Sequence, residues 1–201
     1  MRAVIIGNGD IKDYKYIKSK ISADDFVICA DGGLRHIENL DIKADVAIGD
    51  FDSADIDEEI THYVFPVDKD YTDGELAVNY AVENGYDDIL LIAMTGQRLD
   101  HTLTNIFLLA RHKNMCLIDD KNEIYVVKDR LEIENKVNKT LSVIPVFSDL
   151  EINYIRGVKY PLEKETLYFG TGRGNSNVVV SSKCVISISK GIGVVIITDG
   201  E

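Results

Sequence analysis

The chain has 201 residues, 45% of them hydrophobic, and its 22 Lys and Arg against 34 Asp and Glu give a formal net charge of −12. This composition excludes a disordered chain, and the length allows one or two domains whose core needs no disulfides. The acidic balance argues against nucleic-acid binding, which requires a basic face. No apolar run approaches the roughly 18 residues of a membrane helix.

The N-terminus and the cysteines bear on the cellular compartment. The first apolar run, Ala3–Ile6, is too short for a secretory signal. Cys29, Cys116 and Cys184 are scattered and fit neither a disulfide framework nor a metal-knuckle spacing. We therefore expect a cytoplasmic protein with buried free thiols.

Residues 1–120 alternate short apolar runs with helix-like stretches. The expected strands are Ala3–Gly7, Phe26–Ala30, Val46–Gly49, His62–Phe65, Ile89–Ala93 and Met115–Ile118. The expected helices are Asp13–Ile21, Leu34–Leu40, Thr72–Asn84 and Leu99–Lys113. This alternation predicts an α/β domain with a parallel sheet and helices on both faces.

The last of these helices has the clearest periodicity. Its apolar face consists of Leu103, Ile106, Phe107 and Ala110, at i, i+3, i+4 and i+7. The basic residues 111–113 suit a helix C-terminus, and Asp100 is the expected N-cap.

After Asp120 the helical periodicity disappears. The expected strands are Glu123–Lys128, Leu131–Glu134, Thr140–Phe147, Ile152–Val158, Thr166–Phe169, Asn177–Ser182, Val185–Ser189 and Gly193–Thr198. The pattern predicts an all-β sandwich or barrel of about eight strands. We therefore expect an N-terminal α/β domain, residues 1–120, followed by a C-terminal β-sandwich, residues 121–201, closely joined around residues 119–122.

Four polar clusters follow expected strands, and an open α/β sheet binds its ligands beyond the carboxyl ends of the strands. The first cluster is Ala30-Asp31-Gly32-Gly33, whose glycines allow the backbone to approach a phosphate. The chain has neither a dinucleotide fingerprint nor a P-loop. Taken alone, this cluster is better explained as a strand-to-helix turn.

The second cluster is Gly49-Asp50-Phe51-Asp52-Ser53. In an extended segment Asp50 and Asp52 point the same way, and two such carboxylates repel each other unless a cation lies between them. The pair therefore favours a Mg²⁺ site over a polar turn in which Asp52 or Ser53 caps a helix.

The third cluster runs from Asp68 to Glu75. Thr72 and Glu75 have the spacing of a capping box, so Glu75 is assigned to structure. Asp70 and Asp73 are less completely explained in this way and could reach a metal ion shared with the second cluster. Lys69 is the nearby cation for a phosphate.

The fourth cluster runs from Thr95 to His101 and is followed by Asn105. Arg98 suits a bidentate phosphate contact, and His101 and Asn105 lie on one helix face. A single histidine is more often a surface or capping residue than a catalyst, so His101 is a secondary candidate.

The four clusters together resemble the thiamine pyrophosphokinase family. The matching stretches are Cys29–Gly33, Ile48–Ser53, Lys69–Asp73 and Gly96–His101, in the family's order and with similar spacing, together with Gly172–Asn177, which resembles the family's Ser-Asn loop. The resemblance covers nearly the whole chain. It implies transfer of a pyrophosphoryl group from ATP to the hydroxyl of thiamine, giving thiamine diphosphate and AMP.

The same resemblance implies where the ligands bind. The N-terminal domain would hold ATP and Mg²⁺, the C-terminal domain would hold thiamine, and the active site would lie between the subunits of a homodimer. The implied metal ligands are Asp50, Asp52 and Asp73, with Asp31 and Asp70 at the ion or next to it. The implied catalytic residues are Asp70, Arg98 and Asp100. The implied ATP contacts are Asp31, Gly32, Gly33, Lys69, Thr72, Arg98 and His101, and the implied thiamine contacts are Asp100, Ser176 and Asn177. Asp100 would orient the acceptor hydroxyl or accept its proton.

Two alternatives remain from the sequence. A pyrophosphokinase acting on another alcohol, such as a hydroxymethylpterin, would keep the chemistry, although the loop at Gly172–Asn177 argues against it. A non-catalytic nucleotide or metal sensor would tolerate the loss of a carboxylate, whereas every candidate is present. Formation of AMP distinguishes the enzyme from the sensor.

Overall fold

A computed structural model describes residues 1–49, 61–64, 70–96 and 98–199. The chain forms two compact units, Met1–Asp120 and Lys121–Glu201. Among the described residues, no helix combines the length and the hydropathy that crossing a membrane requires.

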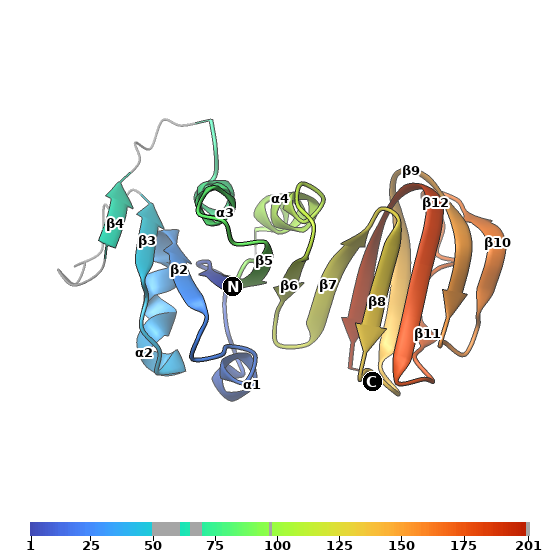
Figure 1. The fold of residues 1–201 in the computed structure, drawn as a ribbon, viewed down its shortest axis with the longest axis horizontal. Helices are drawn as coiled ribbons and strands as arrows, with labels where there is room; N and C mark the ends of the chain where they lie inside the picture. Colours follow the sequence, from blue (N-terminus) through green and yellow to red (C-terminus); the bar gives the residue numbers. More distant parts are fainter. Residues whose placement is uncertain (50–60, 65–69, 97, 200–201) are drawn as a thin grey trace. The chain divides into compact units, whose positions relative to one another are not determined.

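The first unit is built on a parallel sheet (Figure 1). Its strands are β1 (Arg2–Ile6), β2 (Phe26–Ala30), β3 (Val46–Gly49), β4 (Thr61–Val64), β5 (Asp88–Ile92) and β6 (Met115–Ile118). Their spatial order is β6-β5-β1-β2-β3-β4. The order reverses at β1, which pairs with β5 on one side and β2 on the other, so the loops that follow these strands form a natural ligand crevice. The prediction of a parallel α/β sheet is confirmed.

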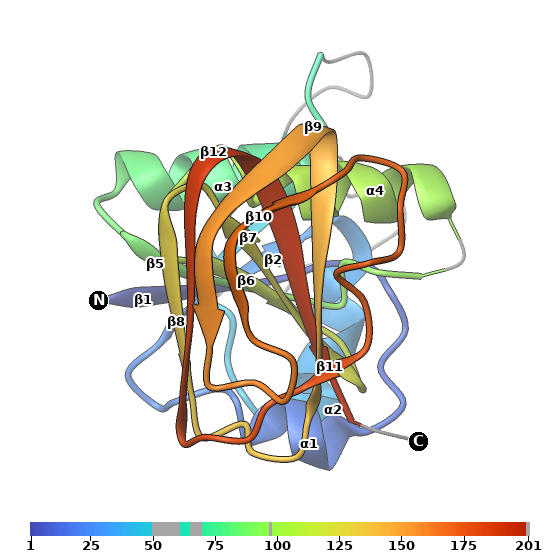
Figure 2. The same ribbon diagram turned by 90° about the vertical axis from the view of Figure 1, so that its right-hand side faces the viewer.

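Helices cover both faces of this sheet (Figures 1 and 2). They are α1 (Tyr14–Lys18), the 3₁₀ helix η1 (Asp31–His36), α2 (Ile37–Leu40), α3 (Asp73–Glu83) and α4 (Leu99–Leu108). On one face, Ile17 of α1 and Leu40 of α2 pack with Val4 and Ile6 of β1. Successive strand residues point to opposite faces, so Ile5 faces the side of α3 and α4.

The end of α4 departs from the sequence prediction. The helix ends at Leu108 instead of Lys113, and its buried residues include Leu108, whereas Leu103 of the predicted apolar face is 43% exposed. The prediction that Asp100 is the N-cap is wrong, because Arg98 occupies that position and makes no side-chain capping bond. Asp100 instead pairs with Arg98, as described below.

The second unit is an antiparallel β-sandwich. Its strands are β7 (Asn122–Val127), β8 (Arg130–Glu134), β9 (Thr140–Arg156), β10 (Leu162–Leu167), β11 (Asn177–Val178) and β12 (Lys183–Thr198). Two of these strands, β9 and β12, each merge two of the predicted runs. The first half of β9 pairs with β11 and its second half with β10. The first half of β12 pairs with β8 and its second half with β7, and the two long strands also pair with each other.

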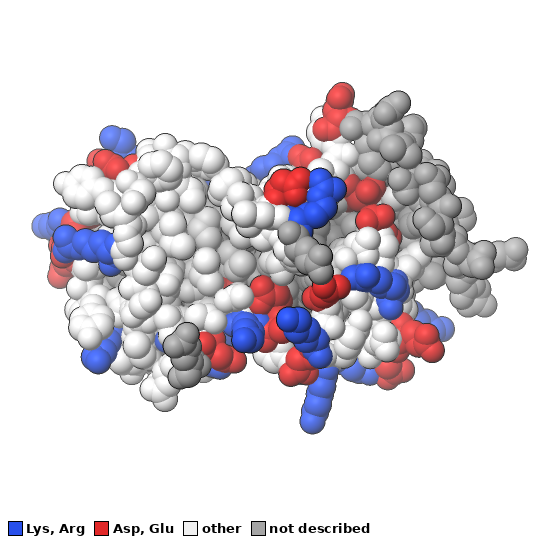
Figure 3. Space-filling model, turned by 180° about the vertical axis from the view of Figure 1, so that it is seen from behind, with Lys and Arg blue, Asp and Glu red and all other residues white. Residues whose placement is uncertain are grey.

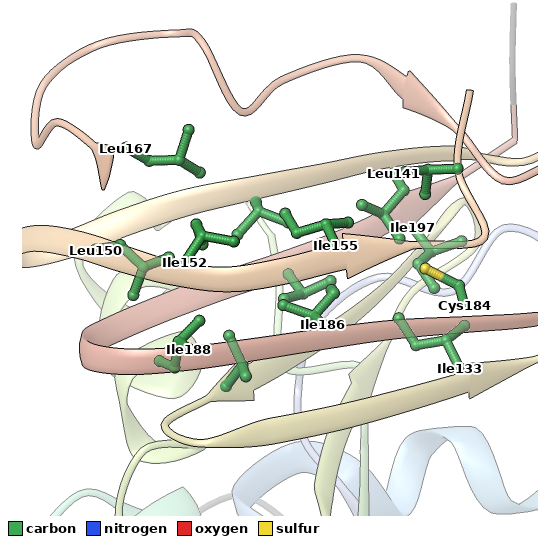
Figure 4. Close-up of a cluster of buried hydrophobic side chains, with 14 of the residues drawn as sticks. Ile133, Leu141, Leu150, Ile152, Ile155, Leu167, Cys184, Ile186, Ile188 and Ile197 are labelled. Carbon is green, nitrogen blue, oxygen red and sulfur yellow. The ribbon is translucent and has the colours of Figure 1, made fainter. Parts of the chain in front are cut away.

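Irregularities, and not turns, separate the halves of β9 and β12. Phe147 in β9 has φ 67°, and β12 shifts register between Ser187 and Ile192. Such bulges change which alternate residues face inward. In β12 the core includes the even-numbered Ile186 and Ile188 toward the start of the strand and the odd-numbered Val195 and Ile197 after the shift. These side chains pack with those of β9 in one core (Figure 4). The polar residues that suggested turns therefore lie at bulges within continuous strands.

Candidate active site

A cleft of about 480 Å³ opens at the carboxyl ends of β1, β2 and β5 in the first unit. Segments from the strand ends and from the first turns of α3 and α4 line it. The polar side chains among its lining residues are Asn8, Asp10, Asp31, Arg35, Thr72, Asp73, Thr95, Arg98, His101, Thr102 and Asn105. The predicted site residues Asp31, Thr72, Asp73, Arg98 and His101 are thus brought together.

The loop Gly7–Asp10 packs tightly against the segment after β5. The Gly9 amide donates to the Ala93 carbonyl oxygen at 2.6 Å. A Cβ atom on Gly9 would lie 2.2 Å from the Thr95 carbonyl oxygen, so only glycine permits this approach. Ala93 itself has φ 54°, a left-handed conformation that is costly for alanine and is held by the surrounding packing.

Asp31 adopts a similarly rare backbone conformation, with φ 52°. Its Oδ2 atom accepts a hydrogen bond from Asn8 Nδ2 at 3.1 Å, which links the loops after β1 and β2. Gly32 and Gly33 are not among the cleft's lining residues. A Cβ on Gly33 would lie 2.0 Å from the Ile6 carbonyl oxygen, so the packing of η1 against β1 accounts for this glycine.

The capping box predicted at α3 is confirmed. Glu75 N donates to Thr72 Oγ1 at 3.2 Å, and Thr72 N donates to Glu75 Oε2 at 3.1 Å. Glu75 also pairs with Arg111 at 3.0 Å, which agrees with its assignment to structure. Asp73 lies in the first helical turn and lines the cleft, whereas Asp70 is exposed and is not part of the lining.

At the start of α4, Arg98 Nη2 lies 2.6 Å from Asp100 Oδ2. The hydrogen bond to this guanidinium lowers the pKa of Asp100 to about 2, and the Asp100 carboxylate in turn raises the pKa of Arg98. Arg98 lines the cleft and Asp100 does not. Farther along the same helix, Asn105 Nδ2 donates to the Met94 carbonyl oxygen at 2.8 Å, so this amide anchors α4 to the segment after β5.

Asp50, Asp52 and Lys69 lie outside the described residues. Within residues 1–49, 61–64, 70–96 and 98–199, no three His, Cys, Asp or Glu side chains lie close enough together to hold a metal ion. The described carboxylates Asp31 and Asp73 nevertheless line one cleft, and their oxygen atoms are the donors that Mg²⁺ prefers. Figure 3 shows one face of the molecule, where Lys and Arg side chains stand beside Asp and Glu.

In the second unit, Ser176 ends the loop before β11 and Asn177 is the first residue of that strand. Ser176 is exposed and has φ 58°. The Asn177 amide clamps the backbone of Tyr160: Oδ1 accepts from Tyr160 N at 3.0 Å, and Nδ2 donates to the Tyr160 carbonyl oxygen at 2.7 Å. Asn177 Oδ1 also accepts from Val178 N at 2.9 Å. These bonds leave the Asn177 amide little capacity for a ligand.

A small cavity of about 130 Å³ lies beside this clamp. Its walls include Leu141, Val143 and Leu162, and its polar rim includes Tyr160 and Arg173. Arg173 also pairs with Glu165. Apolar walls with a few polar groups are typical of binding sites for small organic molecules.

Sequence reasoning missed Arg35 and His36 as site residues. Arg35 lines the cleft, and its Nη2 atom donates to the carbonyl oxygens of Asn8 at 2.7 Å and Gly9 at 3.1 Å. His36 is buried behind the same loop. Both residues come within three positions of the Asp31-Gly32-Gly33 cluster, but only the fold shows that they turn back toward Gly9.

Two of the three cysteines are buried, as predicted, and Cys116 is partly exposed. Burial raises the pKa of Cys29 to about 12 and that of Cys184 to about 11. These thiols are therefore neutral and unreactive at neutral pH.

Both units match models of one protein family. The family model described as "Thiamin pyrophosphokinase, catalytic domain" matches residues 17–118. A second, described as "Thiamin pyrophosphokinase, vitamin B1 binding domain", matches residues 128–193.

Individual relatives agree with these matches. The chain is 34% identical to a thiamine pyrophosphokinase of Bacillus subtilis over 163 residues, which cover 75% of this chain and 76% of the relative. The structure of this chain is similar to the crystal structure of thiamine pyrophosphokinase from Bacillus subtilis, with a TM-score of 0.86, 28% identity and all of both chains covered. It is also similar to the thiamin pyrophosphokinase structure from Geobacillus thermodenitrificans, with a TM-score of 0.88, 26% identity and coverage of 100% of this chain and 99% of that one.

Proposed function

The chain belongs to the thiamin pyrophosphokinase family, and we propose that it transfers the pyrophosphoryl group of ATP to the hydroxyl of thiamine, giving thiamine diphosphate and AMP. One observation carries this proposal: each unit matches a different domain of the same family. The catalytic-domain model matches the unit that contains the polar cleft, and the vitamin B1 binding model matches the other unit. The second match favours thiamine over a pterin as the acceptor.

On the nucleotide side, we assign ATP to the cleft of residues 1–120. Arg98 and Lys69 would contact phosphate oxygens, with Asp31, Thr72 and His101 along the nucleotide. Gly32 and Gly33 would support these contacts indirectly: Gly33 allows η1 to pack against β1, and Gly32 leaves room for the Asn8 side chain that bonds Asp31.

The metal site would be formed by Asp50, Asp52 and Asp73, with Asp31 and Asp70 nearby. A bound Mg²⁺ ion would neutralise phosphate charge, on which phosphoryl transfer mainly depends together with positioning. Asp50→Asn or Asp52→Asn should abolish turnover while the thermal unfolding temperature stays near that of wild type. Near-normal turnover in either variant would remove that residue from the site.

On the acceptor side, Asp100 would orient the hydroxyl of thiamine. While Arg98 holds its pKa near 2, Asp100 is a weak proton acceptor, so orientation is the role we assign to it. Ser176 would contact the aminopyrimidine, and Asn177 would act on the same site by fixing Tyr160 beside the small cavity.

Donor and acceptor contacts belong to different units, and we propose that two subunits of a homodimer complete each active site. The test mixes Asp73→Asn with Asn177→Ala at a thiamine concentration where each variant alone is inactive. Unfolding and refolding the mixture together should restore about one quarter of wild-type activity, because half of the dimers are hybrids with one intact site. A mixture that remains inactive would place both contributions in one chain.

The activity itself is tested with purified protein, ATP, Mg²⁺ and thiamine, measuring AMP and thiamine diphosphate. Both products should appear in equal amounts. Binding of ATP and thiamine without AMP would instead identify a sensor.

A further inference from the structure

His36 is a buried polar residue for which the proposed reaction has no role. Its side chain is 2% exposed and lies behind the loop Gly7–Asp10 that forms one wall of the cleft. Its two ring nitrogens contact different segments: Nε2 lies 2.8 Å from the Gly9 carbonyl oxygen, and Nδ1 lies 2.8 Å from the hydroxyl of Tyr14 in α1. The ring therefore bridges a helix and the cleft loop.

These contacts fix the tautomer of the ring. A carbonyl oxygen can only accept, so Nε2 must carry the hydrogen that it shares with Gly9. Nδ1 is then the acceptor, and the Tyr14 hydroxyl donates to it. Arg35 Nε, 3.3 Å from Nε2, cannot also donate to that nitrogen. Arg35 instead holds the outer side of the loop through the Asn8 and Gly9 carbonyl oxygens.

The opposite side of the loop is held by backbone. The Gly9 amide donates to the Ala93 carbonyl oxygen and the Gly9 carbonyl oxygen accepts from His36, so Gly9 is fixed between the segment after β5 and the His36 ring. From Asn8, the same loop reaches Asp31 across the cleft. The position of this one residue thus sets the spacing between several groups that line the cleft.

We propose that His36 is a positioning residue for the polyphosphate of the nucleotide, acting through the Gly9 carbonyl and oriented by Tyr14. The proposal rests on the proposed function for the identity of the nucleotide. Its geometric part, that His36 holds the loop, does not depend on catalysis.

The test compares His36→Gln, which retains an N–H donor toward Gly9, with His36→Leu, which removes it. His36→Leu should raise the KM for ATP about tenfold and leave the KM for thiamine within about twofold. The loop that His36 holds lines the nucleotide cleft, so releasing this loop should weaken the binding of ATP and not that of thiamine. His36→Gln should stay within about threefold of wild type for both substrates. Tyr14→Phe should give an intermediate increase in the KM for ATP.

A core variant separates positioning from general destabilisation. Ile17→Ala removes side-chain volume from α1 in the same core, and Ile17 does not line the cleft, so the KM for ATP should not change at temperatures where the protein is folded. Equal KM values for ATP in His36→Leu and His36→Gln, or an equal increase in Ile17→Ala, would overturn the proposal.

Hydrogen exchange gives a readout that is independent of activity. The Gly9 amide should exchange at least tenfold faster in His36→Leu than in wild type or His36→Gln, while the amides of α3 are unchanged. Unchanged Gly9 exchange in His36→Leu would overturn the positioning role. Failure of wild type to form thiamine diphosphate would count against the proposed function and leave this exchange result interpretable.

Discussion

Arg98 and Asp100 form an ion pair two residues apart in the chain, with 2.6 Å between Nη2 and Oδ2, and both side chains are largely exposed. Arg98 lines the cleft, so a phosphate that binds there would compete with Asp100 for the guanidinium. The hydrogen bond to Asp100, and with it the pKa of the Asp100 carboxyl, would then depend on whether a phosphate occupies the cleft.

Replacing Arg98 should return the pKa of Asp100 toward its ordinary value of 3.8. In wild type, the pKa is depressed to about 2, so the stabilisation from the ion pair is present above pH 3.8 and is lost as the pH falls through about 2. NMR titration of the Asp100 carboxyl should therefore show a higher midpoint in Arg98→Gln. Arg111→Gln, which breaks the Glu75 pair instead, is the control and should leave that midpoint unchanged. Identical midpoints in wild type and Arg98→Gln would contradict the assignment.

Gly9→Ala should destabilise the protein by roughly 1–3 kcal/mol and weaken ATP binding, because its Cβ would lie 2.2 Å from the Thr95 carbonyl oxygen and the loop must move. Thermal unfolding and ATP titration measure the two effects. Gly96→Ala is the steric control: its Cβ would lie 3.9 Å from Gly9 Cα, an ordinary contact, so its unfolding temperature should stay near wild type. Equal unfolding temperatures for the two variants would refute the steric argument.

Asn177→Ala should raise the KM for thiamine more than the KM for ATP, because it releases the Tyr160 backbone beside the small cavity. Steady-state kinetics with each substrate varied in turn provide the measurement. Asn153→Ala removes an exposed amide whose Nδ2 atom donates to Ser187 Oγ at 3.3 Å, and it should change neither constant. An equal rise in both KM values for Asn177→Ala would contradict a specific role of this loop in binding thiamine.

Lys136→Met should lower the free energy of unfolding by about 2 kcal/mol, because the largely buried Glu123 loses the ammonium group 2.5 Å from its Oε1 atom. Denaturant unfolding measures the change. The Tyr125 hydroxyl still donates to Glu123 Oε2 at 3.0 Å, and the Lys136 side chain is 21% exposed, so the cost stays below that of a fully buried pair. Adding Glu123→Gln should recover part of the loss. A double variant less stable than Lys136→Met would argue against an unpaired charge as the cause.

Features fixed by local chemistry could be predicted from the sequence. The strands β2, β3 and β6 begin and end where their apolar runs do, and the capping box of Thr72 and Glu75 defines the start of α3. These features depend on residues within a few positions of one another. The strand ends then bring Asp31, Asp73 and Arg98 to one cleft.

Features fixed by packing could not be predicted in this way. The bulges of β9 and β12 resemble turns in sequence, because polar residues interrupt both apolar runs. The family resemblance implies that Asn177 contacts the ligand, but its side-chain amide bonds the backbone of Tyr160, which is 17 residues earlier in the chain. His36 reads as part of a helix, and only the packing of η1 against β1 turns it toward Gly9.

The most direct test of the account is which phosphorus of ATP the acceptor attacks. With ATP labelled on the β-phosphate, purified wild-type protein, Mg²⁺ and thiamine, the label should appear in thiamine diphosphate, and unlabelled AMP should form in equal amount. Accumulation of labelled ADP together with thiamine monophosphate would contradict pyrophosphoryl transfer, even if ATP and thiamine both bind.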